Sequence, residues 1–316
     1  MTDNKWKSGK ADAPSPWKKV IERPTRAAVA ESGNGDQHRR KPVVEARPPR
    51  PAAASPPPRT SDEPRVVRPS GELRLYGVNA CLAAFKARPN DLRKVYLTEA
   101  RIAALKSVLA WCVKNRLGYR VVETADLDKL SGSKHHEGVC FEMLRRPPLE
   151  LASLLAAQPA NDQPSLLLWL DGVGNPHNLG AVLRSAAHFG AGGIVVPRSS
   201  ALDLSGAAAR VAEGGAESVP LMRIDDERAA LDTLRAAGYA IAASVPRDGA
   251  DLFTADLPPR LVLVFGAEGE GMSAPLIAAS DLRLTIPGSG AVESLNIAVS
   301  AAIFLAEYRR RHSLRG

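Results

Sequence analysis

The chain has 316 residues, of which 45% are apolar, and a formal net charge of +8. This length is enough for two domains with a sizeable core, whereas no run of about 18 apolar residues predicts a membrane-spanning helix, and the N-terminus lacks the apolar segment of a secretory signal. Three widely spaced cysteines, Cys81, Cys112 and Cys140, favour buried reduced thiols in a cytoplasmic protein over disulfides or a zinc site.

The N-terminal segment carries most of this net charge. Residues 1–70 contain 15 Lys/Arg and eight Asp/Glu, so seven of the eight net positive charges lie there, together with 12 of the 25 prolines. Such a segment buries too little apolar surface to offset its ordering entropy, and we expect residues 1–71 to form a disordered basic tail. A basic arm suits a polyanion such as RNA, because neutralised phosphates release counterions. A solubilising spacer is the alternative.

Alternating strands and helices begin near residue 72. The pattern predicts strands over 94–100, 119–123 and 138–144, and helices over 78–88, 104–117 and 124–131. Thr124 is the expected N-cap of the third helix, and Gly132 is expected to end it. We therefore predict a small α/β domain over 72–146. The Pro-rich stretch 147–163 is expected to be a linker with one short helix near 149–157.

A second α/β domain is predicted over 164–312. Its expected strands are apolar along their whole length, which is typical of a parallel sheet covered on both faces. They lie at 166–173, 192–197, 219–224, 239–245, 261–266 and 282–287. The expected helices lie at 179–189, 207–213, 226–237, 273–279 and 295–311.

The stretch LDGVGNPHNLGAVLRSAAHFG, from Leu170 to Gly190, is the first candidate for a functional motif. An apolar strand leads into a polar turn with Asn175 and Asn178, and a helix follows. Asn178 is the expected N-cap of that helix. Arg184 lies among small and apolar residues, so we expect a mostly buried guanidinium that needs polar partners. Alternatively, Asn178 only caps the helix and Arg184 only pairs with an acid.

Two further motifs follow later strands. In LVLVFGAEGEGMS, a buried strand enters a Gly-rich turn that carries Glu268, and Gly266 leaves its backbone open to a ligand. The spacing is neither that of a dinucleotide-binding turn nor that of a P-loop. In TIPGSGAVESLNIAVSAAIFLAEYRRR, Ser294 and Asn296 stand at the entry to the last helix, where Ser294 alternatively serves as a cap. This helix is apolar on nearly every face, so we expect it to pack against the core or a second subunit.

The order of these motifs resembles a known family. Asn-Leu-Gly-x-x-x-Arg, then Gly-Ala-Glu-Gly-x-Gly, then Ile-Pro followed by Ser-Leu-Asn resemble the three motifs of the SpoU/TrmH family of RNA ribose 2′-O-methyltransferases in the SPOUT superfamily. The resemblance covers about residues 72–312, and the first part, including HHEGVCF from His135, looks like the family's L30e-like RNA-binding domain. The catalytic part resembles members that methylate a guanosine ribose in 23S rRNA, whereas the tail and the AEYRRR ending resemble the YfiF-type tRNA/rRNA branch.

The resemblance implies a fold, a cofactor and an assembly. Family members have a trefoil-knotted domain with a mostly parallel sheet, and the knot holds S-adenosylmethionine. Gly266, Ile286 and Leu295 match backbone positions that hold this cofactor. A homodimer through the C-terminal helix, acting on rRNA or tRNA in the cytoplasm, is implied as well, with neither a membrane nor a DNA partner. Gly288 stands where many members have Met, a departure that affects the shape of the loop.

The resemblance also implies catalytic roles. Arg184 matches the family's catalytic arginine, and Asn178, Glu268, Ser294 and Asn296 match the polar residues around it. In the family, the arginine is proposed to be the base that deprotonates the ribose hydroxyl. A guanidinium normally stays protonated beyond pH 12 or so, which makes that role demanding. The milder role is to bind the adjacent phosphate in a bidentate manner and orient the hydroxyl.

Other functions and other residues compete with this interpretation. A non-catalytic RNA-binding or ribosome-assembly protein that retains the fold is the main alternative, against which the intact Arg184, Glu268 and Asn296 argue. Methylation of a base is a third hypothesis, which the Asn-Leu-Gly-x-x-x-Arg pattern disfavours. His188 is expected to face solvent in the last turn of its helix rather than to act as base. No residues have metal-ligand spacing, so no metal is expected.

Overall fold

The structure, a computed structural model, describes residues 71–312 apart from 148, 268 and 270. Except for Gly71, the predicted disordered tail over 1–71 lies outside the described residues, and so does the site candidate Glu268. Among the residues that are described, no helix is both long and apolar enough to cross a bilayer.

The segment predicted as the small α/β domain forms a four-stranded sheet in the order β1-β4-β2-β3. The pairs β1–β4 and β4–β2 are antiparallel, whereas β2 and β3 run parallel. Its strands are β1 (Glu72–Tyr76), β2 (Leu92–Leu97), β3 (Gly118–Val121) and β4 (Val139–Leu144). Its helices are α1 (Val78–Ala87), α2 (Lys106–Lys114) and α3 (Thr124–Ser131), with short 3-10 turns at Pro89–Asp91 and Glu99–Arg101.

Two details of this segment test the sequence predictions. Glu123, rather than Thr124, is the N-cap of α3, because the helix already begins at Thr124 and no side chain caps it. Gly132 ends the helix in a left-handed conformation (φ 67°), as predicted. The three cysteines are buried, as predicted, and the structure pairs none of them in a disulfide. Burial raises the pKa of the Cys140 thiol to about 12.

The second segment forms a seven-stranded sheet in the order β7-β6-β5-β10-β8-β11-β9. Every neighbouring pair is parallel, which confirms the prediction from the uniformly apolar strands. Its strands are β5 (Ser165–Leu170), β6 (Gly193–Pro197), β7 (Leu221–Ile224), β8 (Ala240–Ser244), β9 (Ala250–Asp251), β10 (Arg260–Phe265) and β11 (Leu282–Thr285).

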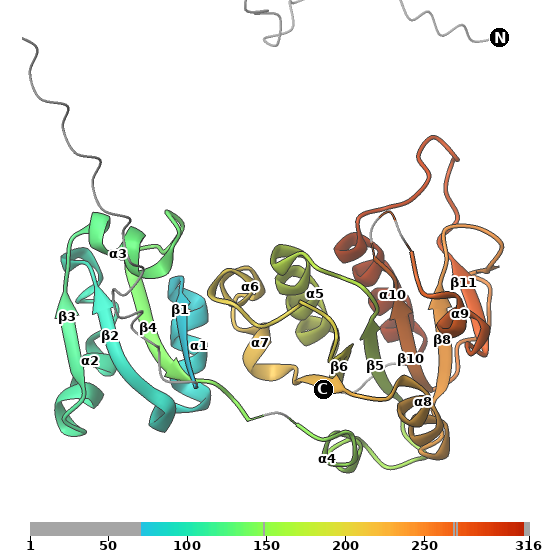
Figure 1. The fold of residues 1–316 in the computed structure, drawn as a ribbon, viewed down its shortest axis with the longest axis horizontal. Helices are drawn as coiled ribbons and strands as arrows, with labels where there is room; N and C mark the ends of the chain where they lie inside the picture. Colours follow the sequence, from blue (N-terminus) through green and yellow to red (C-terminus); the bar gives the residue numbers. More distant parts are fainter. Residues whose placement is uncertain (1–70, 148, 268, 270, 313–316) are drawn as a thin grey trace, which may run out of the picture. The chain divides into compact units, whose positions relative to one another are not determined.

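Helices cover both faces of this sheet (Figure 1). One face packs against α5 (Pro176–Phe189), α6 (Gly206–Ala212), α7 (Gly215–Ser218) and α10 (Ile297–His312). The other packs against α4 (Leu151–Ala156), α8 (Glu227–Ala236) and α9 (Ala274–Ala278). Side chains alternate between these two cores along each strand, and Trp169 of β5 is fully buried on the second face.

Apart from the two 3-10 turns, three elements have no counterpart among the sequence predictions. They are β1, with five residues, α7, with four, and β9, with two. The elements α7 and β9 are too short to show a helical or strand period. The short helix α7 contacts α1 of the first segment and α5 and α6 of the second.

Two of the arginines at the end of the C-terminal helix form ion pairs with Glu307 of the same helix. Glu307, whose side chain is 6% exposed, accepts hydrogen bonds from Arg310 Nε at 2.8 Å and Arg311 Nε at 2.6 Å. Arg311 also donates to the carbonyls of Leu252 and Ala255, which ties α10 to the segment after β9. The hydrogen bond from Arg310, together with that from Arg311, lowers the pKa of the Glu307 carboxyl to about 2.

We expect Glu307→Gln to lower the free energy of unfolding at pH 7. A carboxyl whose pKa is depressed in the folded state stabilises the fold above its unfolded pKa and loses that contribution as pH falls. The difference between wild type and variant should therefore shrink as pH falls from 4.5 toward 2. Urea unfolding at a series of pH values measures it, and a difference that does not vary with pH would contradict the assignment.

Candidate active site at the carboxyl edge of the sheet

Three loops meet at one edge of the seven-stranded sheet. They follow β5, β10 and β11, and each carries one of the motifs singled out in the sequence. Because β10 pairs with β5 and β8, and β11 pairs with β8, all in parallel, the three carboxyl ends lie at the same edge. Neighbouring strands lie about 5 Å apart, and three such spacings separate β5 from β11. The loops after β5 and β11, the outer two, therefore leave the sheet about 15 Å apart. Ligands of open parallel sheets bind at such an edge.

The first and second loops are bonded to each other. The Asp171 N–H donates to the Phe265 carbonyl at 2.8 Å, and Asp171 Oδ2 accepts from the Ser273 N–H at 2.8 Å. Gly172, with φ 70°, lies so close to the second loop that a Cβ there would stand 3.1 Å from Ala267 Cβ. Asp171 therefore fixes one loop against the other. This role of Asp171 was not predicted from the sequence. The one feature that could have indicated it is that Asp171 is the first polar residue after a buried strand.

The glycine-rich second loop folds back on itself. Ala267 and Gly271 exchange two backbone hydrogen bonds, of 2.8 and 2.9 Å. A Cβ on Gly266 would lie 2.3 Å from both the Gly271 carbonyl carbon and the Met272 nitrogen, so no other residue fits without moving the turn. The structure thus gives Gly266 a definite reason to be glycine, which is closure of the turn. Its predicted contact with a cofactor stays a prediction.

The start of α5 differs from the sequence prediction. The helix begins at Pro176, and Asn175 is its N-cap, with its side-chain oxygen accepting from the His177 N–H at 2.9 Å. Asn178, the predicted cap, is instead in the first turn. Pro at the first helical position shifts the start upstream, because its fixed φ suits a helix and its missing N–H needs no partner. The helix ends at Gly190 with φ 77°, as predicted.

Asn178 joins the first motif to the third. Its Oδ1 accepts a hydrogen bond from Asn296 Nδ2 at 3.2 Å, across 118 residues of sequence. Asn296 Oδ1 in turn accepts from the Ala298 N–H at 2.9 Å, so Asn296 caps the start of α10. Capping orients the Asn296 amide with its oxygen on the helix and its nitrogen toward Asn178. The structure therefore gives the capping role to Asn296 and not to Ser294.

Arg184 is exposed, which corrects the prediction of a mostly buried guanidinium. Its side chain makes no hydrogen bond or ion pair with any residue in the part of the chain that the structure describes. Its backbone, by contrast, is tightly packed, since a Cβ on Gly215 would stand 3.1 Å from Arg184 Cα. One turn earlier, Gly180 allows the Ala208 carbonyl to approach within 2.5 Å of where a Cβ would be. The apolar neighbours of Arg184 thus bury the opposite side of the helix.

The remaining predicted residues lie on the loops after β10 and β11. Ser294 and Leu295 are exposed, with Leu295 at 43%, whereas Ile286 is half-buried against the core. Gly266 and Ile286 follow β10 and β11, the two neighbours of β8. The structure therefore places them at the same edge without a direct contact. Glu268 lies outside the described residues.

The edge is open toward solvent at its glycines. A Cβ added to Gly174, Gly269, Gly271, Gly288 or Gly290 would meet no atom within 4 Å. These five positions belong to all three loops. A ligand can therefore approach the main chain closely from this side, which suits a small molecule recognised by backbone N–H and C=O groups.

The histidines have different surroundings. His188 is exposed in the last turn of α5, as predicted, and contacts the Phe189 ring edge-on. His136 is 3% exposed, with Nε2 bonded to Asp128 Oδ1 at 3.1 Å and Nδ1 accepting from the Gly138 N–H. Its role is therefore structural, whereas His135 is exposed. No three His, Cys, Asp or Glu side chains in the described ranges are grouped to hold a metal ion.

Comparisons with known families agree with this division of the chain. The family described as "SpoU rRNA Methylase family" matches residues 165–306, which hold the parallel sheet and its three loops. The family described as "RNA 2′-O ribose methyltransferase substrate binding" matches residues 74–147, which hold the four-stranded sheet.

Individual proteins match over most of the chain. The chain is 39% identical over 252 residues to the uncharacterized tRNA/rRNA methyltransferase YfiF of Escherichia coli O157:H7, covering 79% of this chain and 72% of that protein. It is 36% identical over 246 residues to the 23S rRNA (guanosine-2′-O-)-methyltransferase RlmB of Burkholderia sp, covering 76% and 97%. The SpoU methyltransferase AviRb of Streptomyces viridochromogenes, solved with AdoMet, shares the fold with a TM-score of 0.64 at 24% identity, covering 78% and 92%.

We expect Asn175→Ala to lower the free energy of unfolding by about 1 kcal/mol, the usual cost of losing a side-chain cap. Asn175→Asp retains the acceptor and serves as the matched control. Thermal or urea unfolding measures both. If Asn175→Ala proved neutral while Asn178→Ala destabilised the helix, the cap would be at Asn178, contrary to the structure.

Proposed function

The chain belongs to the SpoU rRNA methylase family, and from this membership we propose that it transfers a methyl group from S-adenosylmethionine to a ribose 2′-hydroxyl of structured RNA. The observation that carries the proposal is the Asn178–Asn296 hydrogen bond, which joins two of the three motifs at the open edge of the parallel sheet. Arg184 lies six residues after Asn178 on the same helix and presents an exposed guanidinium.

The three loops fit the cofactor. S-adenosylmethionine supplies a methyl group on a positively charged sulfur, which is the electrophile of the reaction. Main-chain groups near Gly266, Ile286 and Leu295 bind its adenosine part, and the open glycines let it approach them. Half-buried Ile286 and exposed Leu295 offer apolar surface to the adenine ring. Ser294 and Asn296 hold the third loop in place over the cofactor.

Arg184 binds the RNA phosphate next to the target ribose. A guanidinium is a fork of N–H donors that matches a phosphate in two parallel hydrogen bonds, and it keeps its proton at neutral pH. The exposed side chain can contact RNA in solution, while the packed backbone of the helix holds its Cα in a fixed position. Arg184 thereby orients the 2′-hydroxyl in line with the methyl group, and such alignment lowers the barrier of a displacement. Asn178, held by Asn296, and Glu268 position this arginine.

RNA is the partner, and residues 74–147 bind it, in agreement with the substrate-binding family that they match. Either rRNA or tRNA is the substrate class, since the two relatives described above carry one or both in their names. The reaction takes place in the cytoplasm, without DNA or a membrane as partner. The small sheet with its three helices suits the L30e-like fold that we propose for this segment from its resemblance to the family.

A trefoil knot and a homodimer complete the proposal. Strand β10 is inserted between β5 and β8, and α10 returns to contact α5, which suits a chain threaded as in the family's knot. Next to this contact lie three exposed apolar side chains, Val292 at 69%, Leu295 at 43% and Val299 at 48%. A second copy that packs along α10 removes this apolar surface from water, which supports homodimerisation through the C-terminal helix.

We expect Arg184→Ala to lower methyl transfer by about 100-fold or more, because misaligned reactants lose that much rate. The assay follows labelled methyl from S-adenosylmethionine into separated rRNA and tRNA fractions from cells that lack this protein. Label in 2′-O-methylnucleosides of one fraction identifies the substrate. His188→Ala, an exposed change on the same helix, is the matched control and should leave transfer unchanged.

Cofactor affinity separates this proposal from the non-catalytic alternative. The Arg184→Ala protein should bind S-adenosylmethionine as tightly as wild type, because Arg184 acts on the RNA. A wild-type chain with neither cofactor binding nor transfer would instead be an RNA-binding protein that retains the fold. Label recovered in a methylated base would contradict the assignment to ribose.

A further inference from the structure

Helix α6 belongs in sequence to the methyltransferase segment but packs into the core of the RNA-binding segment. Ala209 of α6 is 3% exposed and lies in the cluster formed by β1, β2, β4, α1 and α2. Gly206 is equally close, because a Cβ there would lie 2.5 Å from the Arg74 carbonyl and 2.6 Å from the Tyr76 ring. The two segments therefore share a packed surface at α6 and are joined by more than the connection through residues 147–163.

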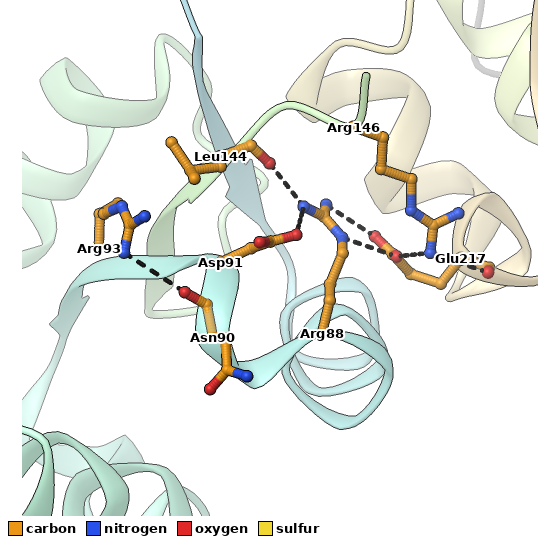
Figure 2. A network of polar contacts seen from close by, with 7 residues as sticks. All are labelled: Arg88, Asn90, Asp91, Arg93, Leu144, Arg146 and Glu217. Atoms are coloured by element: carbon orange, nitrogen blue, oxygen red, sulfur yellow. Dashed lines mark hydrogen bonds and ion pairs between the residues drawn. The ribbon is translucent and has the colours of Figure 1, made fainter. Parts of the chain in front are cut away.

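A carboxylate on the next helix anchors two arginines of the RNA-binding segment. Figure 2 shows Arg88, at the end of α1, and Arg146, just after β4, converging on Glu217 of α7. Arg88 Nε donates to Glu217 Oε2 at 2.9 Å and Arg88 Nη2 to Oε1 at 3.1 Å, a bidentate pair. Arg146 donates to Oε2 and, at 3.1 Å, to the Glu217 carbonyl.

The Arg88–Glu217 pair is enclosed, unlike most ion pairs among the residues that the structure describes. The side chains of Arg88 and Glu217 are 10% and 8% exposed, whereas Arg146 is 39% exposed. Arg88 also donates to Asp91 Oδ2 at 3.3 Å and to the Leu144 carbonyl, so its guanidinium is held from both sides. Loss of Glu217 leaves the enclosed Arg88 with Asp91 as its ion-pair partner, and loss of Arg88 leaves Glu217 with the more exposed Arg146. An enclosed charge that loses its bidentate partner is costly, which makes the contact specific for this arrangement.

The same short helix touches the backbone of the proposed catalytic arginine. Gly215, two residues before Glu217, packs so closely on α5 that a Cβ would lie 2.7 Å from the Leu183 carbonyl and 3.1 Å from Arg184 Cα. The short helix α7 therefore packs directly on the backbone of α5 at Arg184. One continuous path of packed atoms leads from the end of α1, through Glu217 and Gly215, to Arg184.

We propose that Glu217 is a positioning residue that couples the RNA-binding segment to the catalytic helix. Through Arg88 and Arg146 it holds residues 72–146 on α7, and through α7 it sets where bound RNA meets Arg184. The inference rests on the proposed methyl transfer to RNA and adds a requirement to it. RNA must be presented by a segment that is fixed to α5, and a flexibly tethered segment does not suffice.

Two variants test the coupling. Glu217→Gln keeps the shape but removes the charge that both arginines bind. Arg146→Ala removes the more exposed partner and leaves the enclosed Arg88–Glu217 pair intact. This variant should fold even if Glu217→Gln does not, and it then tests the coupling by itself. Both should lower kcat for RNA methylation by about tenfold, a loss expected from slight misplacement of a bound substrate, with unchanged Kd for RNA and for S-adenosylmethionine. Glu217→Asp should recover part of the loss.

A matched control and a distance measurement complete the experiment. Arg235 is 37% exposed and pairs with Asp281 at 3.1 Å inside the methyltransferase segment, so Arg235→Ala should leave kcat unchanged. Spin labels on cysteines introduced at Val113 and Asp232, both exposed, report the distance between the two segments in labelled chain diluted with unlabelled chain. Wild type should give one narrow distribution, which both Glu217→Gln and Arg146→Ala broaden.

The proposal is overturned if the wild-type distribution is already broad, or if Glu217→Gln leaves both the distribution and kcat at their wild-type values. A loss of transfer that follows entirely from weaker RNA binding also overturns it, because Glu217 would then act on affinity alone. If wild type transfers no methyl group to any RNA, the proposed function fails, whereas a narrow distribution that broadens in both variants still establishes that Glu217 holds the segments together.

Discussion

The insertion of β10 between β5 and β8 places the ends of β5, β10 and β11 at one edge of a sheet whose strands all run parallel. The three conspicuous motifs are far apart in sequence, and this strand order alone brings their loops together. Asp171 then bonds the first loop to the second, and the Asn178–Asn296 pair bonds the first to the third. The site is therefore a property of the sheet, since each loop would be an ordinary polar turn without it.

A second constraint acts through glycines at the contacts of α5 with its neighbouring helices. Gly180 and Gly215 allow α6 and α7 to reach van der Waals contact with its backbone, which fixes the axis of the helix. The side chain of Arg184 nevertheless points to solvent. A rigid backbone with an exposed guanidinium is a suitable arrangement for binding an external anion, because within the described residues the side chain has no ion pair to break before it binds a phosphate. It also explains why a helix rich in alanine and glycine carries this residue.

Most strands and helices can be predicted from the sequence, because the strands are continuous apolar runs and the helices repeat apolar residues at helical spacing. The predictions differ from the structure where a neighbouring proline or a tertiary contact decides the outcome. Asn178 looked like a cap, yet Pro176 moved the helix start and gave that role to Asn175. Arg184 looked buried because its neighbours are apolar, but those neighbours occupy the other side of the helix. Glu217 gave no signal in the sequence, since a lone glutamate in a four-residue helix becomes notable only when Arg88 and Arg146 bind it.

The most direct test of the account is a crystal structure of the chain with S-adenosylhomocysteine. The account predicts that the ligand lies at the carboxyl edge, in contact with main-chain atoms near Gly266, Ile286 and Leu295, with its sulfur directed toward the Arg184 side of the Asn178–Asn296 pair. A ligand bound elsewhere on the chain, or at this edge with its sulfur directed away from Arg184, would contradict the claim that the three loops form one site for methyl transfer.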